Sequence, residues 1–212
     1  MLFYYGADKI VDKPIYNYGN SSNDYGLGFY LTTDKRMAEL WASKNKNGGY
    51  VIKYELDINE LNVLYLNNSD KESVLKWISL LIRHRFSNDD YERAKSTIDF
   101  LSNKYYVDLS NYDLIVGYRA DDSYFSYSRD FVFNDLSLEM LKKAMELGNL
   151  GLQYVLKSKK AFDKIKIISY EKVPYSKDYE SFRFKTLNEY SIIKESDSIN
   201  NTFIRDIMRG DK

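Results

Sequence analysis

Residues 24–41 read Asp-Tyr-Gly-Leu-Gly-Phe-Tyr-Leu-Thr-Thr-Asp-Lys-Arg-Met-Ala-Glu-Leu-Trp and combine a turn, a short strand and the start of a helix. Gly26 and Gly28 permit backbone conformations that other residues avoid, and residues 29–31 have the aromatic and aliphatic character of a strand. The stretch therefore predicts a loop that leads into a strand carrying Tyr30.

A helix is expected directly after this strand. Thr32 or Thr33 can cap its first turn, because a hydroxyl oxygen accepts a hydrogen bond from a free backbone N–H there. Its apolar residues recur at helical spacing and share one face. They are Met37, Ala38, Trp41 and Ala42.

The glycines of this stretch do not form a phosphate-binding loop. A dinucleotide-binding pattern needs its glycines after a strand and before a helix, with a third glycine at fixed spacing. Here the glycines precede a strand, and Leu31 occupies the third position. What remains is either a structural turn beside a core tyrosine or a clamp that presents an aromatic face to a ligand.

Composition excludes several classes of site. The 212 residues contain 31 Lys and Arg, 31 Asp and Glu, no Cys and one His, so the formal net charge is zero. No global field attracts nucleic acid or anionic lipid, and disulfides, thiolate nucleophiles and cysteine or histidine zinc sites are not expected. No apolar run reaches the roughly 18 residues of a membrane span and the N-terminus lacks a basic signal-peptide region, so a cytoplasmic protein without membrane contact is expected.

The order of expected elements favours the α+β class over a regular β-α-β alternation. Strands are expected near residues 2–5, 29–31, 50–56, 63–66, 114–117, 151–156 and 165–169. The strands at 50–56 and 63–66 follow each other closely and suggest an antiparallel pair. Helices capped by Asp70 and Ser137, with another from Asp90 to about Lys104, complete the pattern, and two of them form a helical insertion between strands.

The chain divides into a domain at residues 1–173 and a tail at residues 174–212. The tail is either frayed or an amphipathic helix that docks on the domain or on a partner, since Ile199, Phe203, Ile204, Ile207 and Met208 fall at approximate helical spacing.

Two basic features have ordinary explanations. His84 lies between Arg83 and Arg85 at the end of a helix, where cations interact favourably with the helix dipole. The lysines at 157, 159, 160, 164 and 166 form the densest basic cluster, which is either a solvated face or a surface for RNA or DNA.

Four motifs, in this order and spacing, resemble a bacterial family catalogued only as a domain of unknown function, which is itself similar to the ADP-ribosyltransferases. They are F-Y-Y-G at residues 3–6, D-Y-G-L-G-F-Y-L-T with the A-E-L-W-A helix, D-L-I-V-G-Y-R-A-D-D-S-Y-F at 113–125, and G-N-L-G-L-Q-Y-V-L-K-S at 148–158. The resemblance covers residues 1 to about 170. It implies a split antiparallel β-sheet with a helical insertion, and NAD as the substrate.

The resemblance also implies roles for single residues. In the diphtheria-toxin and poly(ADP-ribose) polymerase branch, three motif positions hold His, Tyr and Glu, and here Tyr5, Tyr30 and Gln153 occupy them. Tyr5, followed by Gly6, would contact the adenosine side of NAD, Tyr30 would stack on nicotinamide, and Gln153 would bond the other ribose. Gln153 carries no charge and cannot take a proton.

Further candidates lie after the predicted strand at residues 114–117. Arg119 suits the NAD pyrophosphate, because a guanidinium group matches phosphate oxygens, or else it pairs with a neighbouring carboxylate. Asp121 or Asp122 would assist the acceptor, and Tyr124 or Phe125 would complete an aromatic sandwich around nicotinamide.

The leading hypothesis is an NAD-dependent ADP-ribosyltransferase that acts as an intracellular bacterial toxin on a protein or nucleic-acid acceptor, encoded beside a small antitoxin. The alternatives are a degenerate family member that binds a nucleotide or a protein partner without turnover, and a simple NAD hydrolase. Tyr30 and Gln153 must face one crevice if the enzyme hypothesis is to stand.

Overall fold

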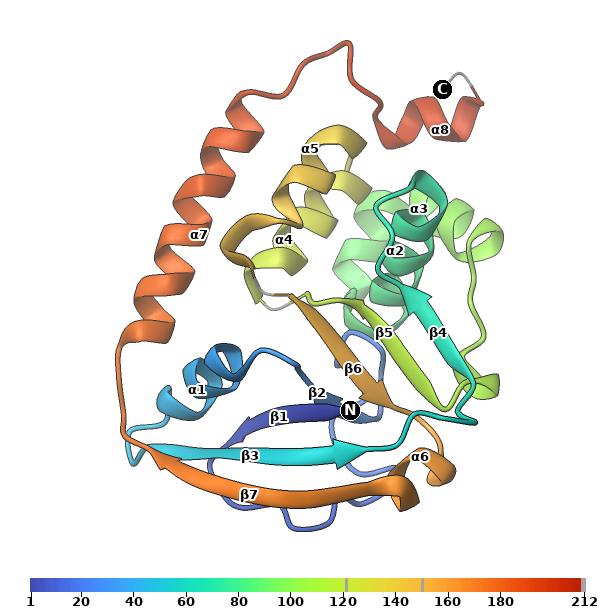
Figure 1. Cartoon of the computed structure of the whole chain (residues 1–212). Coiled ribbons are helices and arrows are strands. Elements are labelled where there is room, and N and C mark those ends of the chain that lie inside the picture. Colours follow the sequence, from blue (N-terminus) through green and yellow to red (C-terminus); the bar gives the residue numbers. More distant parts are fainter. Residues whose placement is uncertain (121, 150, 211–212) are drawn as a thin grey trace.

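The structure, a computed structural model, describes residues 1–120, 122–149 and 151–210 and consists of two β-sheets with helices packed around them (Figure 1). The α+β class predicted from the sequence is confirmed. The first sheet is antiparallel throughout and has the strand order β1-β3-β7. Its strands are β1 (Leu2–Ala7), β3 (Gly49–Leu56) and β7 (Ile165–Val173).

The second sheet has the strand order β2-β6-β5-β4. Its strands are β2 (Phe29–Leu31), β6 (Leu152–Leu156), β5 (Leu114–Tyr118) and β4 (Val63–Leu66). The two sheets meet where Tyr4 and Thr32 exchange backbone hydrogen bonds of 2.7 and 3.0 Å. The sheet is therefore split, with β1 and β2 in contact at a single bridge.

The predicted antiparallel pairing of β3 with β4 is wrong, because these strands belong to different sheets. β4 instead runs parallel to β5. A parallel pair needs a long crossover connection, which the helices α2 (Lys71–Arg85) and α3 (Asn88–Lys104) supply. The helical insertion expected between strands is thus this crossover.

The remaining helices surround the second sheet and the ends of both sheets (Figure 1). They are α1 (Lys35–Ser43), α4 (Asp122–Val132), α5 (Leu138–Ala144), α6 (Lys159–Lys164), α7 (Asp178–Glu195) and α8 (Ile204–Arg209), with 3-10 turns η1 (Leu109–Asn111) and η2 (Leu147–Asn149).

Helix caps follow local sequence in most cases. Asp70 accepts a hydrogen bond from the Ser73 N–H at 2.9 Å, and Ser137 accepts one from the Met140 N–H at 3.2 Å, as predicted. The cap of α1 was predicted wrongly. Asp34 fills this position by accepting from the Arg36 N–H, because the backbone of Thr32 is already engaged with β1.

The second sheet lies between two apolar layers. Residues that alternate along its strands face either the first sheet or the helices, as the pleat of a strand requires. Leu114 and Val116 of β5 pack with Phe3 and Tyr54 of the first sheet, whereas Ile115 packs with the helical core. Along β2 and β6, successive side chains therefore face alternately the helical core and the first sheet.

Helix α1 lies unusually close to the first sheet. A Cβ atom added to Gly6 would overlap the carbonyl oxygen of Ala38, and one added to Gly49 would meet the backbone of Ala42. Only hydrogen fits at these positions. Gly6 therefore has a packing reason of its own, whatever its part in binding.

The C-terminal segment docks on the domain. Tyr190 of α7 stacks on Tyr127 with ring centroids 3.8 Å apart and donates a 2.6 Å hydrogen bond to Asp130. Ile204 and Ile207 of α8 are buried in the helical core. Of the two alternatives for the tail, helical docking describes α7 and α8, whereas Ile199 lies between these helices and is 91% exposed, so its predicted place on the docked face is wrong.

Both α4 and α7 were absent from the sequence prediction. Their aromatic and serine-rich sequences have modest helix propensity, so burial of Tyr127, Phe131 and Tyr190 stabilises them through tertiary contacts.

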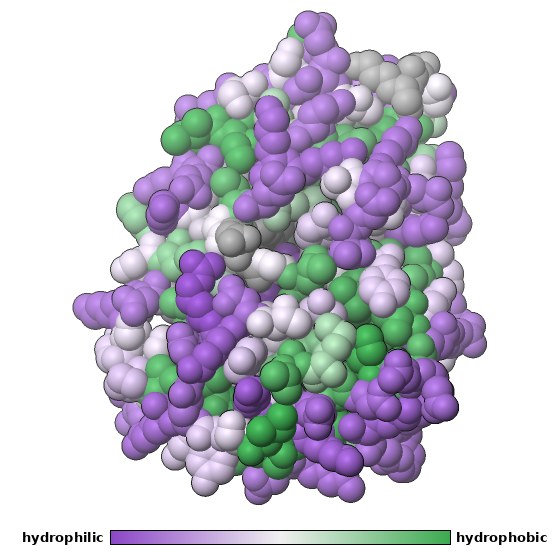
Figure 2. Space-filling view, viewed as in Figure 1, coloured by the Kyte–Doolittle hydropathy of each residue, from purple (hydrophilic) through white to green (hydrophobic). Residues whose placement is uncertain are grey.

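The face of the molecule in Figure 2 is mixed in character. Figure 2 shows hydrophilic side chains over most of the helical upper half and apolar groups among hydrophilic ones over the strands below. Leu2, Ile168 and Tyr170 of β1 and β7 are among the exposed large apolar residues. Within residues 1–120, 122–149 and 151–210, every helix is too short or too polar to cross a bilayer.

We predict that Gly6→Ala destabilises the protein by about 2–3 kcal/mol, the usual cost of forcing extra volume into a tight contact. The measurement is urea unfolding. Gly151→Ala is the control, because Gly151 has open space around its Cα but a positive φ of 65°, so it should cost only about 1 kcal/mol. Equal losses in the two variants would contradict the packing argument.

Candidate functional site

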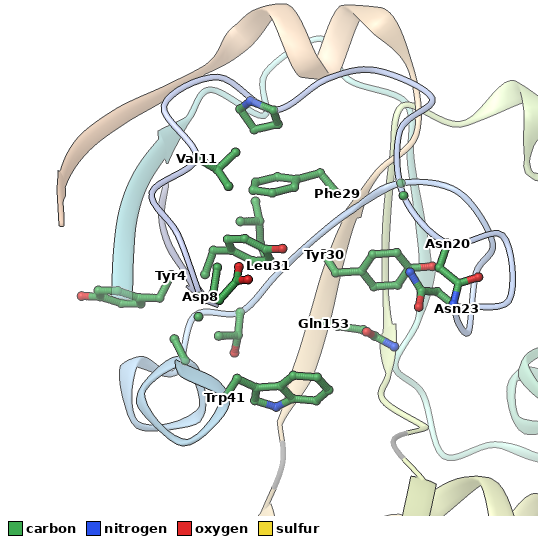
Figure 3. Close-up of a pocket in the computed structure, with 18 of the residues that line it drawn as sticks. Tyr4, Asp8, Val11, Asn20, Asn23, Phe29, Tyr30, Leu31, Trp41 and Gln153 are labelled. Atoms are coloured by element: carbon green, nitrogen blue, oxygen red, sulfur yellow. The ribbon is translucent and has the colours of Figure 1, made fainter. Parts of the chain in front are cut away.

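A cavity of about 980 Å³ opens beside the junction of the two sheets (Figure 3). Its walls come from β1, β2, α1, the end of β5 and the loop at residues 8–23. The side chains with chemical interest that line it are Tyr5, Tyr30, Trp41, Arg85, Arg119 and Gln153.

Tyr30 and Gln153 share one face of the second sheet. Tyr30 pairs with Val155 across β2 and β6, and Gln153 lies two residues before Val155, so strand alternation turns both toward the helical side. Figure 3 shows Tyr30 and Phe29 extending in opposite directions from β2. Both predicted residues therefore line the same cavity, as the enzyme hypothesis required.

The hydroxyl of Tyr30 already forms hydrogen bonds with the glycine loop, which comprises residues 24–28. It donates to the Gly26 carbonyl at 2.6 Å and accepts from the Tyr25 N–H at 3.1 Å. Burial raises the pKa of Tyr30 far above its usual range, so the phenol stays neutral at pH 7. What Tyr30 offers a ligand is its ring rather than its proton.

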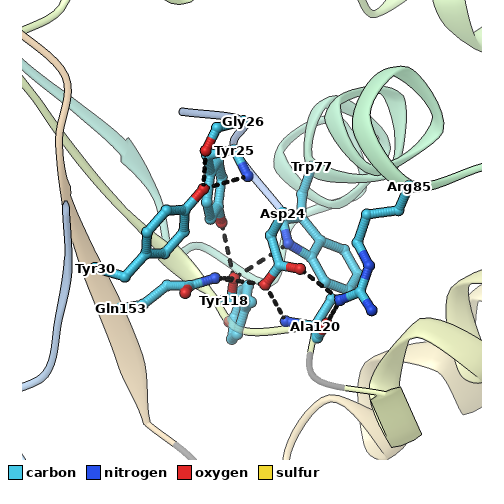
Figure 4. A network of polar contacts seen from close by, with 9 residues as sticks. All are labelled: Asp24, Tyr25, Gly26, Tyr30, Trp77, Arg85, Tyr118, Ala120 and Gln153. Carbon is cyan, nitrogen blue, oxygen red and sulfur yellow. Dashed lines mark hydrogen bonds and ion pairs between the residues drawn. The ribbon is translucent and has the colours of Figure 1, made fainter. Parts of the chain in front are cut away.

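A buried carboxylate organises the polar side of the cavity (Figure 4). Asp24 is 6% exposed and accepts hydrogen bonds of 2.7 Å from Arg85 Nη1, from the Ala120 N–H and from Gln153 Nε2. Gln153 Nε2 also donates to the Tyr118 carbonyl at 3.2 Å. These contacts join the glycine loop to β6, to the end of β5 and to the last turn of α2.

Tyr25 fills the space next to Gln153. Gly117 lies opposite Gln153 in the β5–β6 pair, and a Cβ there would collide with the Tyr25 hydroxyl. That hydroxyl donates to the Tyr118 carbonyl at 2.8 Å. A residue larger than glycine at position 117 would displace Tyr25 and with it the loop.

The glycine loop is also held from its other side. Lys157 donates from Nζ to the carbonyl of Tyr25 at 2.7 Å and to that of Leu27. Burial lowers the pKa of Lys157 to about 8. Gly26 has a positive φ of 72°, and a Cβ there would lie 2.7 Å from the His84 ring.

His84 differs from its predicted role at the helix end. Burial, followed by the charges of Lys157 and Arg83, lowers its pKa to about 4, so the imidazole is neutral at pH 7. A neutral ring gains nothing from the helix dipole. Instead, the imidazole ring packs against Gly26 of the glycine loop.

Tyr5 lines the cavity from the far side of β2. Its ring is 4.7 Å from that of Phe29, which faces the first sheet, away from Tyr30. Burial and the nearby Asp8 raise the pKa of Tyr5. The residues that line the cavity thus include Tyr5, Gly6, Tyr30 and Gln153.

Arg119 lies at the α1 end of the cavity. Its guanidinium carbon is 5.7 Å from the centroid of the Trp41 ring, and Lys44 Nζ is 4.2 Å from the same ring. Tyr179 of α7 completes this aromatic and cationic corner. An anionic group would meet favourable charge here.

Of the remaining candidates, the structure describes only the side chain of Phe125. Phe125 packs against Phe86 and under the Arg85 guanidinium at 4.6 Å, and it is not among the described residues that line the cavity. Asp121 lies outside the described residues, and so do the side chains of Asp122 and Tyr124, although Asp122 begins α4. Their proposed roles stay predictions.

The lysine cluster contributes to structure. Lys160 and Lys164 donate to the carbonyls of Glu60 and Asn59, which connects α6 to the turn before β4. Lys159 pairs with Asp163 within α6. These contacts favour the interpretation of the cluster as a solvated protein face over a surface for RNA or DNA.

Sequence reasoning missed Asp24 and Arg85 as site residues. Asp24 opens the stretch that carries Tyr30 but shows no local pattern of its own, and Arg85 looked like one of three cations at a helix end. The two meet only in the folded chain. Among the described residues, no three His, Cys, Asp or Glu side chains gather in a metal-binding arrangement.

The profile of a family described as "Protein of unknown function (DUF3990)" matches residues 1–167. The chain therefore belongs to this family. No curated protein and no solved structure matches the chain. The matched region includes the cavity walls from both sheets and ends before α7.

We predict that His84 makes stability depend on pH. The unfolded chain binds a proton near the ordinary pKa of 6.5, but the folded chain binds it only near 4, so stability falls as pH drops through this window. Melting temperatures of the wild type and His84→Gln, measured at about pH 7.5 and about pH 5, check this. The wild type should lose more than the variant. Parallel losses would rule out the buried neutral imidazole.

Proposed function

We propose that this member of the DUF3990 family binds NAD in the Tyr30–Gln153 cavity and transfers ADP-ribose from NAD to an acceptor. One observation carries the proposal. Tyr30 and Gln153, far apart in the sequence, lie on the same face of the second sheet and line one cavity with Tyr5. By the sequence resemblance, these are the three positions assigned to the ADP-ribosyltransferase motif.

The size and lining of the cavity support a dinucleotide. Its volume of about 980 Å³ falls at the upper end of the range for small-molecule and cofactor sites. It offers aromatic surface at Tyr5, Tyr30 and Trp41, and cations at Arg85 and Arg119. A ligand with two rings joined by a pyrophosphate matches this distribution.

The reaction sets clear demands on these residues. The bond between nicotinamide and the ribose carbon breaks, and its electron pair leaves with nicotinamide. A nucleophilic atom of the acceptor then bonds the same carbon and loses its proton to a base or to water. The ribose passes through oxocarbenium character, so a site must hold the sugar, bury the leaving ring and exclude stray water.

Each residue has a role that fits its geometry. The Tyr30 ring stacks on nicotinamide, since its hydroxyl is occupied by the loop. Gln153 bonds a hydroxyl of the nicotinamide ribose, Tyr5 contacts the adenosine side, and Arg119 meets the pyrophosphate. Asp121 or Asp122, which follow β5 in the sequence, assists the acceptor.

A second candidate function is NAD binding without transfer. The observation in its favour is that Gln153, at the position of a glutamate in the motif, donates its amide to Asp24 and has no charge of its own. Plain NAD hydrolysis is a variant in which water replaces the acceptor.

We also propose that the protein acts as a toxin inside bacterial cells and that a small antitoxin protein inhibits it. The support is the resemblance across residues 1 to about 170. Expression of the wild type should slow the growth of a bacterial host, and Tyr30→Ala should relieve this effect.

We predict that NAD raises the melting temperature by about 3–6 °C at ten times its Kd, the shift expected for a chain of this size. Tyr30→Ala should abolish the shift, because the aromatic ring on which nicotinamide stacks is lost. Tyr30→Phe should retain it if the ring is what binds. Tyr50→Ala, a half-buried strand tyrosine outside the cavity, is the control. Absence of any shift at millimolar NAD would contradict the proposal.

Nicotinamide release separates the candidate activities. Transfer predicts release that depends on a cell lysate as the source of acceptor, and hydrolysis predicts equal release without lysate. Binding without release, together with a thermal shift, would support the non-catalytic candidate and overturn transfer.

A further inference from the structure

We infer that Asp24 is a positioning residue that fixes the Gln153 amide so that its carbonyl oxygen is the atom offered to a ligand. The inference rests on the proposal that NAD binds beside Gln153, and it adds a residue to which the motif assigns no role. It concerns which hydrogen-bonding group of the buried Gln153 side chain faces the cavity.

The orientation of the amide follows from the partners of its nitrogen. Gln153 Nε2 lies 2.7 Å from Asp24 Oδ2 and 3.2 Å from the Tyr118 carbonyl oxygen. Both partners are acceptors, so only the amide nitrogen can face them. A flipped amide would set its oxygen against two other oxygens in a site where Gln153 is 4% exposed.

The carboxylate that fixes the amide is itself held firmly. Asp24 Oδ1 bonds Arg85 Nη1, and Oδ2 bonds the Ala120 N–H, each at 2.7 Å. Arg85 also donates to the Ala120 carbonyl (Figure 4). Its guanidinium lies over the Phe125 ring. Side chains of Asp24 and Arg85 are only 8% and 17% exposed, so water competes weakly for these bonds.

The other end of the amide is left for the ligand. Among the described residues, no donor bonds the Gln153 carbonyl oxygen, and Gln153 lines the cavity. A fixed carbonyl accepts from a hydroxyl or N–H and disfavours a group that can only accept. The Gln153 carbonyl oxygen thus favours a ligand hydroxyl, such as that of a ribose. It accepts a hydrogen bond in the way that the carboxylate of a glutamate would at this position.

The arrangement makes an unusual prediction for Gln153→Glu. The new carboxyl would face Asp24 at hydrogen-bond distance, and two such groups resist joint ionisation, which raises the pKa of Glu at this position. While protonated, its O–H can donate to Asp24 and its carbonyl oxygen can meet the ligand. As pH rises through the raised pKa, the two charges repel and both NAD affinity and stability should fall.

Calorimetric titration with NAD, between about pH 5 and about pH 9, tests the inference. Wild-type affinity should change little below about pH 7, since Lys157, which holds the loop next to Asp24, has a pKa of about 8 and loses its proton only above this pH. Gln153→Glu should bind progressively more weakly as pH rises, and Asp24→Asn should bind at least about tenfold more weakly at all pH values, because the amide is no longer fixed.

Asp90→Asn is the matched control for the loss of a buried carboxylate. Asp90 is 4% exposed and pairs with Arg129 at 2.6 Å, but it caps α3 outside the cavity. It should lower the melting temperature without changing NAD affinity. Equal NAD affinities in Asp24→Asn and Asp90→Asn, or tighter pH-independent binding by Gln153→Glu, would overturn the inference.

A measurement without ligand distinguishes failure of this inference from failure of the proposed function. The melting temperature of Gln153→Glu should fall relative to wild type as pH rises, and Asp24→Asn in the same chain should remove this dependence. If the dependence is present but the wild type does not bind NAD, the proposed function fails and the Asp24–Gln153 coupling stands. If the dependence is absent, the coupling is refuted whether or not NAD binds.

Discussion

The ion pair between Asp24 and Arg85 is the contact on which the cavity depends. It brings the glycine loop, the last turn of α2, the exit of β5 and the middle of β6 to one point. Removing one partner of a buried pair is costly, about 3–5 kcal/mol, because a charge is left without compensation. The polar wall of the cavity and the position of Gln153 would change together if this pair were lost.

Close backbone approach is the second constraint on the site. Gly117 makes room for Tyr25, and Gly26 turns against a neutral His84 ring with Lys157 holding the neighbouring carbonyls. Burial lowers the pKa of both His84 and Lys157, and the charges of Lys157 and Arg83 lower that of His84 further. The glycine loop before β2 thus packs against the His84 ring and is held by hydrogen bonds from Lys157. The Tyr30 ring remains facing the cavity.

Local features of the fold could be predicted from the sequence, and long-range ones could not. The caps at Asp70 and Ser137 and the apolar period of α2 depend on residues a few positions apart. The pairing of β4 with β5 depends on a crossover of two helices, and α4 and α7 depend on tertiary burial. For the site, the shared wall of Tyr30 and Gln153 was expected from motif positions. The Asp24–Arg85 contact, 61 residues apart, has no signal in the sequence pattern.

The most direct test of the central claim is a crystal structure of the protein with NAD. We expect NAD in the cavity beside Tyr30, with its nicotinamide ribose hydroxyl bonded to Gln153 Oε1 and with Gln153 Nε2 still bonded to Asp24. NAD bound elsewhere on the protein, or a Gln153 amide that turns its nitrogen to the ligand, would contradict it.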